Sequence, residues 1–205
     1  MSDNDTVFGG NDLNGLIKLS RGIDAVNSRI GKWLSWLILV AVLVSAVNAS
    51  VRKVFDTSSN AWLELQWMLF GAVFLLCSPW TLAVNEHIRI DIINNLLPQR
   101  IRNLIDLVGH SLFLLPLTVV MIVTSLPFFM ASWRIGEQSF SAGGLPQWPA
   151  KFLVLIGFVL LFLQGISELI KRIAVMRGLI DDPYLRRQHP LEAEVEHLVE
   201  AIEKR

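Results

Sequence analysis

The sequence predicts an all-α integral membrane protein with four transmembrane helices, amphipathic helices at the membrane interface, and both termini in the cytoplasm. Hydrophobic residues make up 53% of the 205 residues and charged residues only 18%, with a mean hydropathy of +0.50. The apolar residues are gathered in long blocks that carry no charge, and lysine and arginine are distributed unevenly between these blocks. These observations together are typical of a multi-pass membrane protein.

Four apolar blocks are long enough to cross a bilayer. The hydrocarbon core is about 30 Å thick and a helix rises about 1.5 Å per residue, so a span needs about 20 apolar residues. Such blocks cover residues 33–51, 65–84, 107–133 and 148–167. Val47-Asn48-Ala49 resembles a signal-peptide cleavage site, but the length of the first block and the residues before it favour a permanent span.

The orientation follows from lysine and arginine, because cytoplasmic loops carry an excess of both. With four spans, the two termini and the middle loop share one side of the membrane. That side holds 14 of the 18 basic residues. The opposite side holds only Arg52, Lys53, Arg134 and Lys151. We therefore expect both termini to be cytoplasmic.

Charge and cysteine content exclude several classes of protein. Eighteen acidic residues balance eighteen basic ones, so nothing indicates nucleic-acid binding. Cys77 is the only cysteine, which excludes an internal disulfide and a cysteine-based metal cluster. The sequence has no phosphate-binding glycine loop, metal-ligand cluster or nucleophile–base motif, so we expect neither an enzyme nor a cofactor or metal.

The chain divides into three parts. In residues 1–32, apolar residues recur at three- and four-residue spacings, which predicts an amphipathic helix along the cytoplasmic interface before the chain turns into the bilayer. Residues 33–170 form the four-span domain, with a second interfacial helix over 88–97 and a new helix starting near Pro98. Both interfacial helices are membrane anchors or a shelf against another protein. Residues 171–205 form an acidic tail, which we expect to be helical and cytoplasmic. Side chains expected at headgroup depth are Lys32, Trp33, Trp36 and Trp148.

The loop over residues 136–149 is the most unusual segment between spans. Gly143 and Gly144 permit positive backbone dihedral angles, while Pro146 and Pro149 restrict theirs. The loop is either a tight connector or a shaped surface that meets another protein. Glu64 and Glu168, near the ends of their spans, raise the same question, because a carboxylate near hydrocarbon is costly unless it is paired or hydrated.

Three groups of residues follow one another on the four-span frame. Glu64 and Trp67 lie at the second span, which ends in the run Asn85-Glu86-His87-Ile88-Arg89-Ile90-Asp91. The third group is Gly136-Glu137-Gln138-Ser139, then Gly143-Gly144-Leu145-Pro146 and Pro149, then Gln164-Gly165-Ile166-Ser167-Glu168. In this order and spacing, the chain resembles the DctQ family, the small membrane subunit of tripartite ATP-independent periplasmic (TRAP) transporters, over about residues 30–175.

The resemblance implies an accessory scaffold of a sodium-coupled secondary transporter that imports an organic acid, a carboxylate, across the bacterial inner membrane. The implied partners are a large multi-span subunit (DctM type), a periplasmic substrate-binding protein (DctP type) and the phospholipid bilayer. Nothing in the family suggests that the small subunit itself holds substrate or sodium. The residues that we predict to contact partners are Glu64, Trp67, Asn85, His87, Arg89, Asp91, Glu137, Ser139, Gly143, Gly144, Leu145, Pro146, Pro149, Gln164 and Glu168.

Two other functions stay open at the level of sequence. A homo-oligomeric channel or small transporter would need a polar pore lining, for which the spans offer little beyond Ser45, Asn48, Thr118 and Thr124. A membrane anchor for a redox enzyme would need two histidines inside the bundle to hold a haem, and only His110 lies near the hydrocarbon. Asp106 and His110 lie one helical turn apart, a spacing that suits a proton relay or two ionisable groups at headgroup level.

Overall fold

The computed structural model describes residues 7–56, 59–84 and 99–180, and this part of the chain is helical apart from its loops. Its elements are α1 (Val7–Phe55), α2 (Asn60–Val84), α4 (Gln99–Gly109), the π-helical turn η1 (His110–Leu114), α5 (Leu115–Ile135) and α6 (Trp148–Met176). Because α4, η1 and α5 follow one another without a break, they form one helical path. The described residues thus contain four helices that are long and apolar enough to cross a membrane, as predicted.

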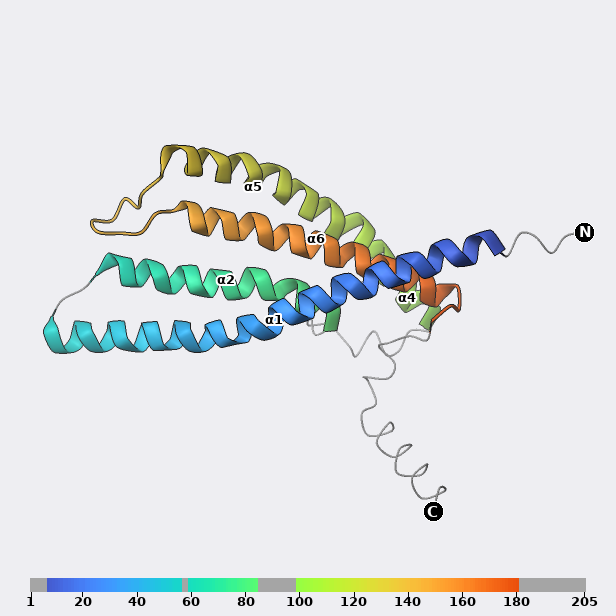
Figure 1. Cartoon of the computed structure of the whole chain (residues 1–205), viewed down its shortest axis with the longest axis horizontal. Helices are drawn as coiled ribbons and strands as arrows, with labels where there is room; N and C mark the ends of the chain where they lie inside the picture. Colours follow the sequence, from blue (N-terminus) through green and yellow to red (C-terminus); the bar gives the residue numbers. More distant parts are fainter. Residues whose placement is uncertain (1–6, 57–58, 85–98, 181–205) are drawn as a thin grey trace, which may run out of the picture.

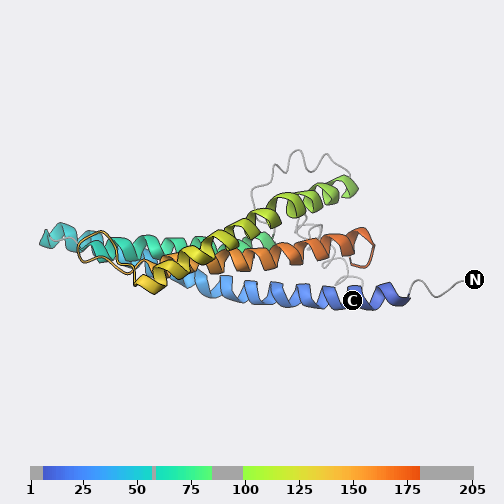
Figure 2. The ribbon, with the colours of Figure 1, turned by 90° about the horizontal axis from the view of Figure 1, so that it is seen from above.

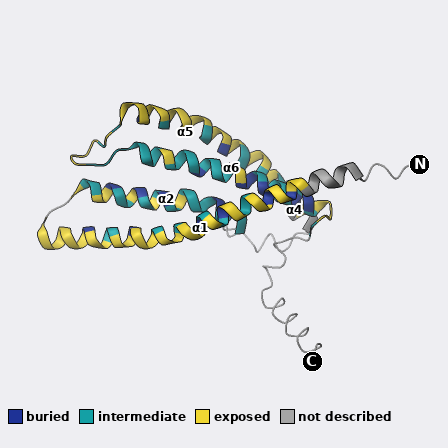
Figure 3. Ribbon diagram, viewed as in Figure 1, coloured by how far each residue is buried: buried dark blue, intermediate teal, exposed yellow. Residues whose placement is uncertain are grey.

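The long helices lie side by side in the order α5, α6, α2, α1 (Figure 1). Contacts join α1 with α2, α2 with α6, and α6 with α5, and the amino-terminal half of α1 also packs on α6. Seen from above, α1, α2 and α6 stay close to one layer, and α5 crosses α6 obliquely (Figure 2). The bundle is therefore open, and most positions on α1 and α5 are exposed on its outside (Figure 3).

Helix α1 differs from the sequence expectation, because no turn separates an interfacial segment from the first span. A single helix runs through all 49 residues from Val7 to Phe55. No proline interrupts this stretch, and Gly31 stays helical because the Trp80 ring of α2 packs directly over it. A Cβ on Gly31 would lie 2.7 Å from that ring. The amino-terminal segment and the first predicted span are therefore parts of one helix.

The third predicted span contains a local change of helix type. The Leu115 N–H donates to the carbonyl oxygen of His110, five residues earlier, which closes a π-helical turn. Pro116 follows at the start of α5, where its missing N–H and its ring disfavour regular α-helical bonding to the preceding turn. The extra residue in the turn accommodates the proline, and the path continues from α4 into α5.

Small and polar side chains form the contacts between helices. Buried positions recur at seven-residue spacing on α5, at Thr118, Ser125 and Ser132, and on α1 in two pairs, Ser20 with Asn27 and Ala41 with Asn48. On α6, Gly157 faces α2 so closely that an added Cβ would lie 2.9 Å from the Leu75 Cβ. Close approach of small residues is the usual way in which membrane helices pack, because lipid supplies no hydrophobic driving force between them.

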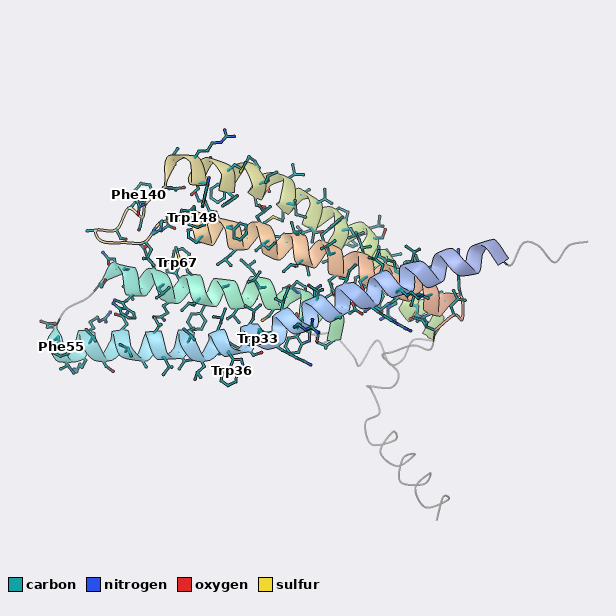
Figure 4. All side chains as sticks on the ribbon, in the orientation of Figure 1. Trp33, Trp36, Phe55, Trp67, Phe140 and Trp148 are labelled. Carbon is teal, nitrogen blue, oxygen red and sulfur yellow. The ribbon has the colours of Figure 1, made fainter. Side chains whose placement is uncertain are left out.

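The outward faces carry large apolar and aromatic side chains. Trp33 and Trp36 on α1 are 75% and 68% exposed and point away from the neighbouring helices (Figure 4). Trp148 at the start of α6 instead packs edge-on against Trp133, with the ring centroids 4.5 Å apart. An indole suits the boundary between lipid and water, and the depth of these rings in a bilayer stays a prediction.

Candidate functional site

The loop between α5 and α6 is held to α2 by one carboxylate. Glu64, in the first turns of α2, is buried, and both of its carboxyl oxygens accept hydrogen bonds from the loop. The hydroxyl of Ser139 donates to Oε1, and the backbone N–H of Leu145 donates to Oε2 at 2.6 Å. We call this arrangement the Glu64 clamp. It satisfies a carboxylate that would otherwise be costly at the end of a span.

The loop backbone is folded so that both donors of the clamp face α2. The Ser139 N–H donates to the Leu145 carbonyl at 3.1 Å, and the neighbouring residues Gln138 and Pro146 form an antiparallel bridge. The turn between them closes through a bond from the Gly144 N–H to the Ser141 carbonyl at 3.0 Å. Gly143 has a φ of +71°, which strains any residue with a Cβ. The two glycines are thus required by the shape of the turn.

Gly144 also lies directly against the clamp. A Cβ at this position would lie 2.5 Å from the Ser139 Cβ and 2.7 Å from Glu64 Oε1. Both distances are shorter than the van der Waals contact of these atoms. Ser139 and Glu64 are hydrogen-bonded to each other, so they cannot move away without breaking the clamp. A second tie joins the same region, because Asn60 Nδ2 at the start of α2 donates to the Ala142 carbonyl at 3.0 Å.

A salt bridge holds the base of the loop. Lys151, in the first turn of α6, pairs with Glu137, and its ammonium lies 3.9 Å from the centroid of the Phe128 ring. The hydrogen bond from Lys151 lowers the pKa of the Glu137 carboxyl below its ordinary value of 4.5. Glu137 also accepts the Gln147 N–H on its backbone carbonyl at 2.9 Å, and Pro149 occupies the first turn of α6, where its missing N–H is harmless.

The loop presents one large apolar side chain that packs against none of the described residues. Phe140, next to Ser139 of the clamp, is fully exposed and points away from the helices (Figure 4). Burying such a ring is worth about 1.5–3 kcal/mol, so its exposure on a well-ordered loop is unfavourable in the isolated chain. Trp67, near the end of α2 that carries Glu64, is half exposed.

A polar cluster at the other end of the molecule is centred on Gln164 of α6. This side chain is fully buried and accepts a hydrogen bond from Asn27 Nδ2 of α1 at 2.7 Å on its Oε1. Its Nε2 donates to Asp24 Oδ1 at 2.7 Å and to Glu168 Oε1 at 3.0 Å. All of the hydrogen-bonding groups of the amide are therefore engaged, which a buried amide needs.

Further bonds complete this inner cluster. The ammonium of Lys171 lies 3.0 Å from Asp24 Oδ2 and 2.5 Å from Glu168 Oε1, so one cation serves carboxylates from two helices. The hydroxyls of Ser20 and Ser167 lie 2.8 Å apart, and Ser167 also donates to Asp24 Oδ1 at 2.8 Å. The cluster fastens the amino-terminal half of α1 to α6.

Arg172 fastens α4 to α6 in the same region. It is buried, and its guanidinium lies 2.5 Å from Asp106 Oδ2 and 3.0 Å from Asn103 Oδ1. His110 lies one turn after Asp106, but its Nδ1 is 2.5 Å from the backbone carbonyl of Asp106. The described structure therefore pairs the Asp106 carboxylate with Arg172 and not with the imidazole, which weakens the idea of a proton relay.

The structure brings two subsets of the predicted contact residues together. Glu64, Ser139, Gly144 and Leu145 meet in the clamp, and Gln164 and Glu168 meet in the inner cluster. The predicted contacts Asn85, His87, Arg89 and Asp91 lie outside the described residues. Whether any of the set contacts a second protein stays a prediction.

Sequence reasoning missed the α1 half of the inner cluster. Asp24 of α1 accepts hydrogen bonds from three side chains of α6, and nothing in the sequence analysis singled it out. The available signal was the seven-residue spacing of small and polar residues, between Ser20 and Asn27 and between Ala41 and Asn48, which is typical of a seam between helices. In residues 7–56, 59–84 and 99–180, no three His, Cys, Asp or Glu side chains gather in a way that would hold a metal ion.

The fold and the two polar ties define a multi-pass α-helical membrane protein whose buried polar groups join its helices to each other. A family model described as tripartite ATP-independent periplasmic transporters, DctQ component, matches residues 41–175. Because this match covers well over half of the chain, the protein belongs to the DctQ family and is a small component of a TRAP transporter. Comparison with curated proteins and with solved structures gives no match.

Proposed function

We propose that this chain is the scaffold subunit of a sodium-coupled TRAP transporter that imports an organic acid across the bacterial inner membrane. A large membrane subunit moves the substrate, and a periplasmic binding protein delivers it. Both termini of the chain lie in the cytoplasm, so the loop over residues 136–149 faces the periplasm. Sodium coupling and an organic-acid substrate are what membership of this family leads us to expect.

The observation that carries the scaffold role is the open, layer-like arrangement of the helices. α5 packs on α6 and has no comparable contact with α1 or α2 among the described residues. A substrate path needs helices that surround it and polar or broken segments that line it. The hydroxyls of Thr118, Thr124 and Ser125 instead donate to carbonyls of their own helix, at 3.0, 2.8 and 2.5 Å. This supports a scaffold over a self-sufficient channel.

The ties at the two ends supply the stiffness that a scaffold needs. The Glu64 clamp joins the 136–149 loop to α2, and the inner cluster joins α1 to α6. A domain that moves substrate changes position relative to a fixed neighbour, so the neighbour must keep its shape. Hydrogen bonds inside a low-dielectric membrane boundary are well suited to keeping helices in register.

The 136–149 loop is the part that we assign to contact with a partner. Its backbone is held by the clamp, and Phe140 is left exposed next to it. A rigid loop that presents an aromatic side chain loses little conformational entropy on binding. Aromatic residues are also enriched among the side chains that dominate binding energy at interfaces.

Reconstitution tests the role directly. Proteoliposomes are prepared with the large subunit and binding protein, with or without this chain, and uptake of a radiolabelled carboxylate is measured under an inward sodium gradient. We expect uptake only with all components, and none from this chain alone. Phe140→Ala should lower the yield of the purified complex, whereas Ser141→Ala, at the neighbouring exposed position, should not. Full uptake without this chain would contradict an obligatory scaffold.

A further inference from the structure

A pocket opens between α1 and the end of α6, beside the inner cluster. Its volume is about 490 Å³, within the range of sites for small molecules and headgroups. On α1 its walls are Ile17, Ser20, Arg21 and Asp24. On the other side they are Lys171 and the backbone turn over residues 178–180 that follows α6. Neither the Glu64 clamp nor the proposed contact loop involves this pocket.

The position of the pocket places it at the level of lipid headgroups. The apolar block of the fourth span ends at Ser167, and Lys171 lies one helical turn beyond it. The pocket is therefore at the leaflet opposite the 136–149 loop. Ile17, Leu179 and Ile180 provide apolar wall next to the charged groups, a combination that fits a molecule with one polar and one apolar part.

Two cationic groups in the pocket have donors to spare. Arg21 is exposed and makes no hydrogen bond or ion pair with the described residues. Lys171 directs its ammonium to Asp24 and Glu168, which leaves one of its three N–H groups. A guanidinium and an ammonium on facing helices are the donor pair that proteins use for a phosphate.

The carboxylate of Asp24 decides which phosphate fits. Arg21, Lys171 and Asp24 line the pocket, and Glu168, outside the lining, shares the Lys171 ammonium with Asp24, so these four side chains together carry no net charge. Oδ1 of Asp24 accepts from Gln164 and Ser167, while Oδ2 accepts only from Lys171 and keeps one lone pair. The side chain of Asp24 is 29% exposed, so this lone pair is within reach of a ligand.

We propose that this pocket binds the headgroup of a zwitterionic phospholipid of the phosphatidylethanolamine type. Arg21 and the third N–H of Lys171 hold the phosphodiester, and Oδ2 of Asp24 accepts a hydrogen bond from the lipid ammonium. An anionic headgroup or free phosphate has no ammonium of its own to pair with Asp24, so the carboxylate repels it and it binds less well. The bound lipid adds its phosphodiester and ammonium to the hydrogen bonds of the inner cluster, and in this way it links α1 to α6.

Native mass spectrometry of the full chain tests this. The protein is purified in detergent, supplied with equal amounts of phosphatidylethanolamine and phosphatidylglycerol, and the lipids retained on the folded protein are identified. We expect one retained phosphatidylethanolamine on the wild type. Arg21→Gln should lower its retention about tenfold, because a charge-assisted contact to the phosphate is lost. The control Arg29→Gln removes an exposed arginine of the same helix outside the pocket, and should retain lipid like the wild type.

Asp24→Asn tests the selectivity. Without the carboxylate the pocket is positively charged, so the ratio of retained phosphatidylethanolamine to phosphatidylglycerol should fall and even reverse. This ratio is read on folded protein, so it is independent of any loss of stability. Equal retention by Arg21→Gln and Arg29→Gln would overturn the proposal. Equal retention of the two lipids by the wild type, or displacement of the lipid by millimolar inorganic phosphate, would overturn it as well.

Discussion

Gly144 lies against the carboxylate of Glu64, so closely that a Cβ on Gly144 would come within 2.7 Å of Glu64 Oε1. The contact joins residues 80 positions apart, one in the second long helix and one in the loop before the last. It allows the loop backbone to deliver the Leu145 N–H to the same carboxylate at 2.6 Å. The shape of the proposed partner surface therefore depends on a glycine within the loop and on an acid that lies on another helix.

Gly144→Ala should open the Glu64 clamp. The added methyl group cannot be accommodated at 2.5 Å from the Ser139 Cβ, so the loop must move and the buried carboxylate loses donors. We expect the free energy of unfolding to fall by about 1–3 kcal/mol, the cost of leaving a buried polar group unsatisfied. Thermal unfolding in detergent measures this, and limited proteolysis of the 136–149 loop should become faster. The control Ser141→Ala changes an exposed position of the same turn, and a loss of stability as large as that of Gly144→Ala would contradict the specific contact.

Glu64→Gln tests the acid itself. The amide oxygen of glutamine can still accept the Leu145 N–H, and the Ser139 hydroxyl can turn to accept from the amide nitrogen. We expect a smaller loss of stability than for Glu64→Ala, which removes both acceptors. Unfolding midpoints of the two variants decide the matter. Equal midpoints for Glu64→Ala and the wild type would show that the clamp does not stabilise the fold.

The spans were predictable from the sequence, whereas the ties between them were only partly so. Apolar length alone identifies four spanning helices, because the bilayer imposes one length on every span. The sequence also singled out Glu64 and the glycines of the loop, since a carboxylate near hydrocarbon needs partners. It did not reveal that these residues contact each other, because they are far apart along the chain and their distance in space depends on how α2 and α6 pack.

The amino-terminal segment shows more clearly what a pattern of apolar residues cannot predict. Its apolar stripe includes Leu16 and Val26, which are exposed, while the polar residues Ser20 and Asn27 are buried against α6. In a water-soluble protein, a helix that buries its polar face and exposes its apolar face would be unstable. Beside a bilayer it is consistent, because lipid can cover the apolar side and polar groups gain most from meeting each other. A periodicity of apolar residues therefore cannot say which face of a membrane helix is the packed one.

Gly157→Ala should separate α6 from α2. The new Cβ would lie 2.9 Å from the Leu75 Cβ and 3.2 Å from the Leu75 carbonyl oxygen, a backbone atom that cannot rotate away. We expect a loss of about 1–3 kcal/mol, the usual cost of overpacking. Gly71→Ala on α2 is the matched control, since nothing lies within 4 Å of its added Cβ. It should be neutral or stabilising because alanine is the better helix former. Equal unfolding midpoints for the two variants would contradict the close contact.

The salt bridge between Glu137 and Lys151 should make stability depend on pH in the acid range. The pKa of the Glu137 carboxyl is lowered by the hydrogen bond from Lys151, so the folded state binds this proton less readily than the unfolded state. The stabilisation of the fold by this salt bridge is complete at a pH above the ordinary pKa of 4.5, and it is lost as the pH falls through the lowered pKa of Glu137. The difference in unfolding midpoint between the wild type and Glu137→Gln should be constant from about pH 7 to about pH 5.5 and shrink below that. A difference that stays constant to about pH 3 would show that the carboxylate contributes no such linkage.

Arg172 and Asp106 should be strongly coupled. Their side chains are 4% and 10% exposed and 2.5 Å apart, so removal of either leaves a charge that is poorly hydrated. We expect Arg172→Gln or Asp106→Asn alone to lower the free energy of unfolding by about 3 kcal/mol or more. The double variant should lose less than the sum of the single variants, by at least about 1 kcal/mol, because no uncompensated charge remains.

Unfolding of all four proteins in one detergent gives the coupling energy of this pair, and Arg177→Gln, at an exposed arginine just beyond α6, controls for the general loss of positive charge. The same cycle distinguishes a tie between α4 and α6 from two independent surface charges. If the losses of the single variants simply add, the pair does not fasten α4 to α6. The stiffness assigned to this end of the molecule would then depend on the Gln164 cluster alone.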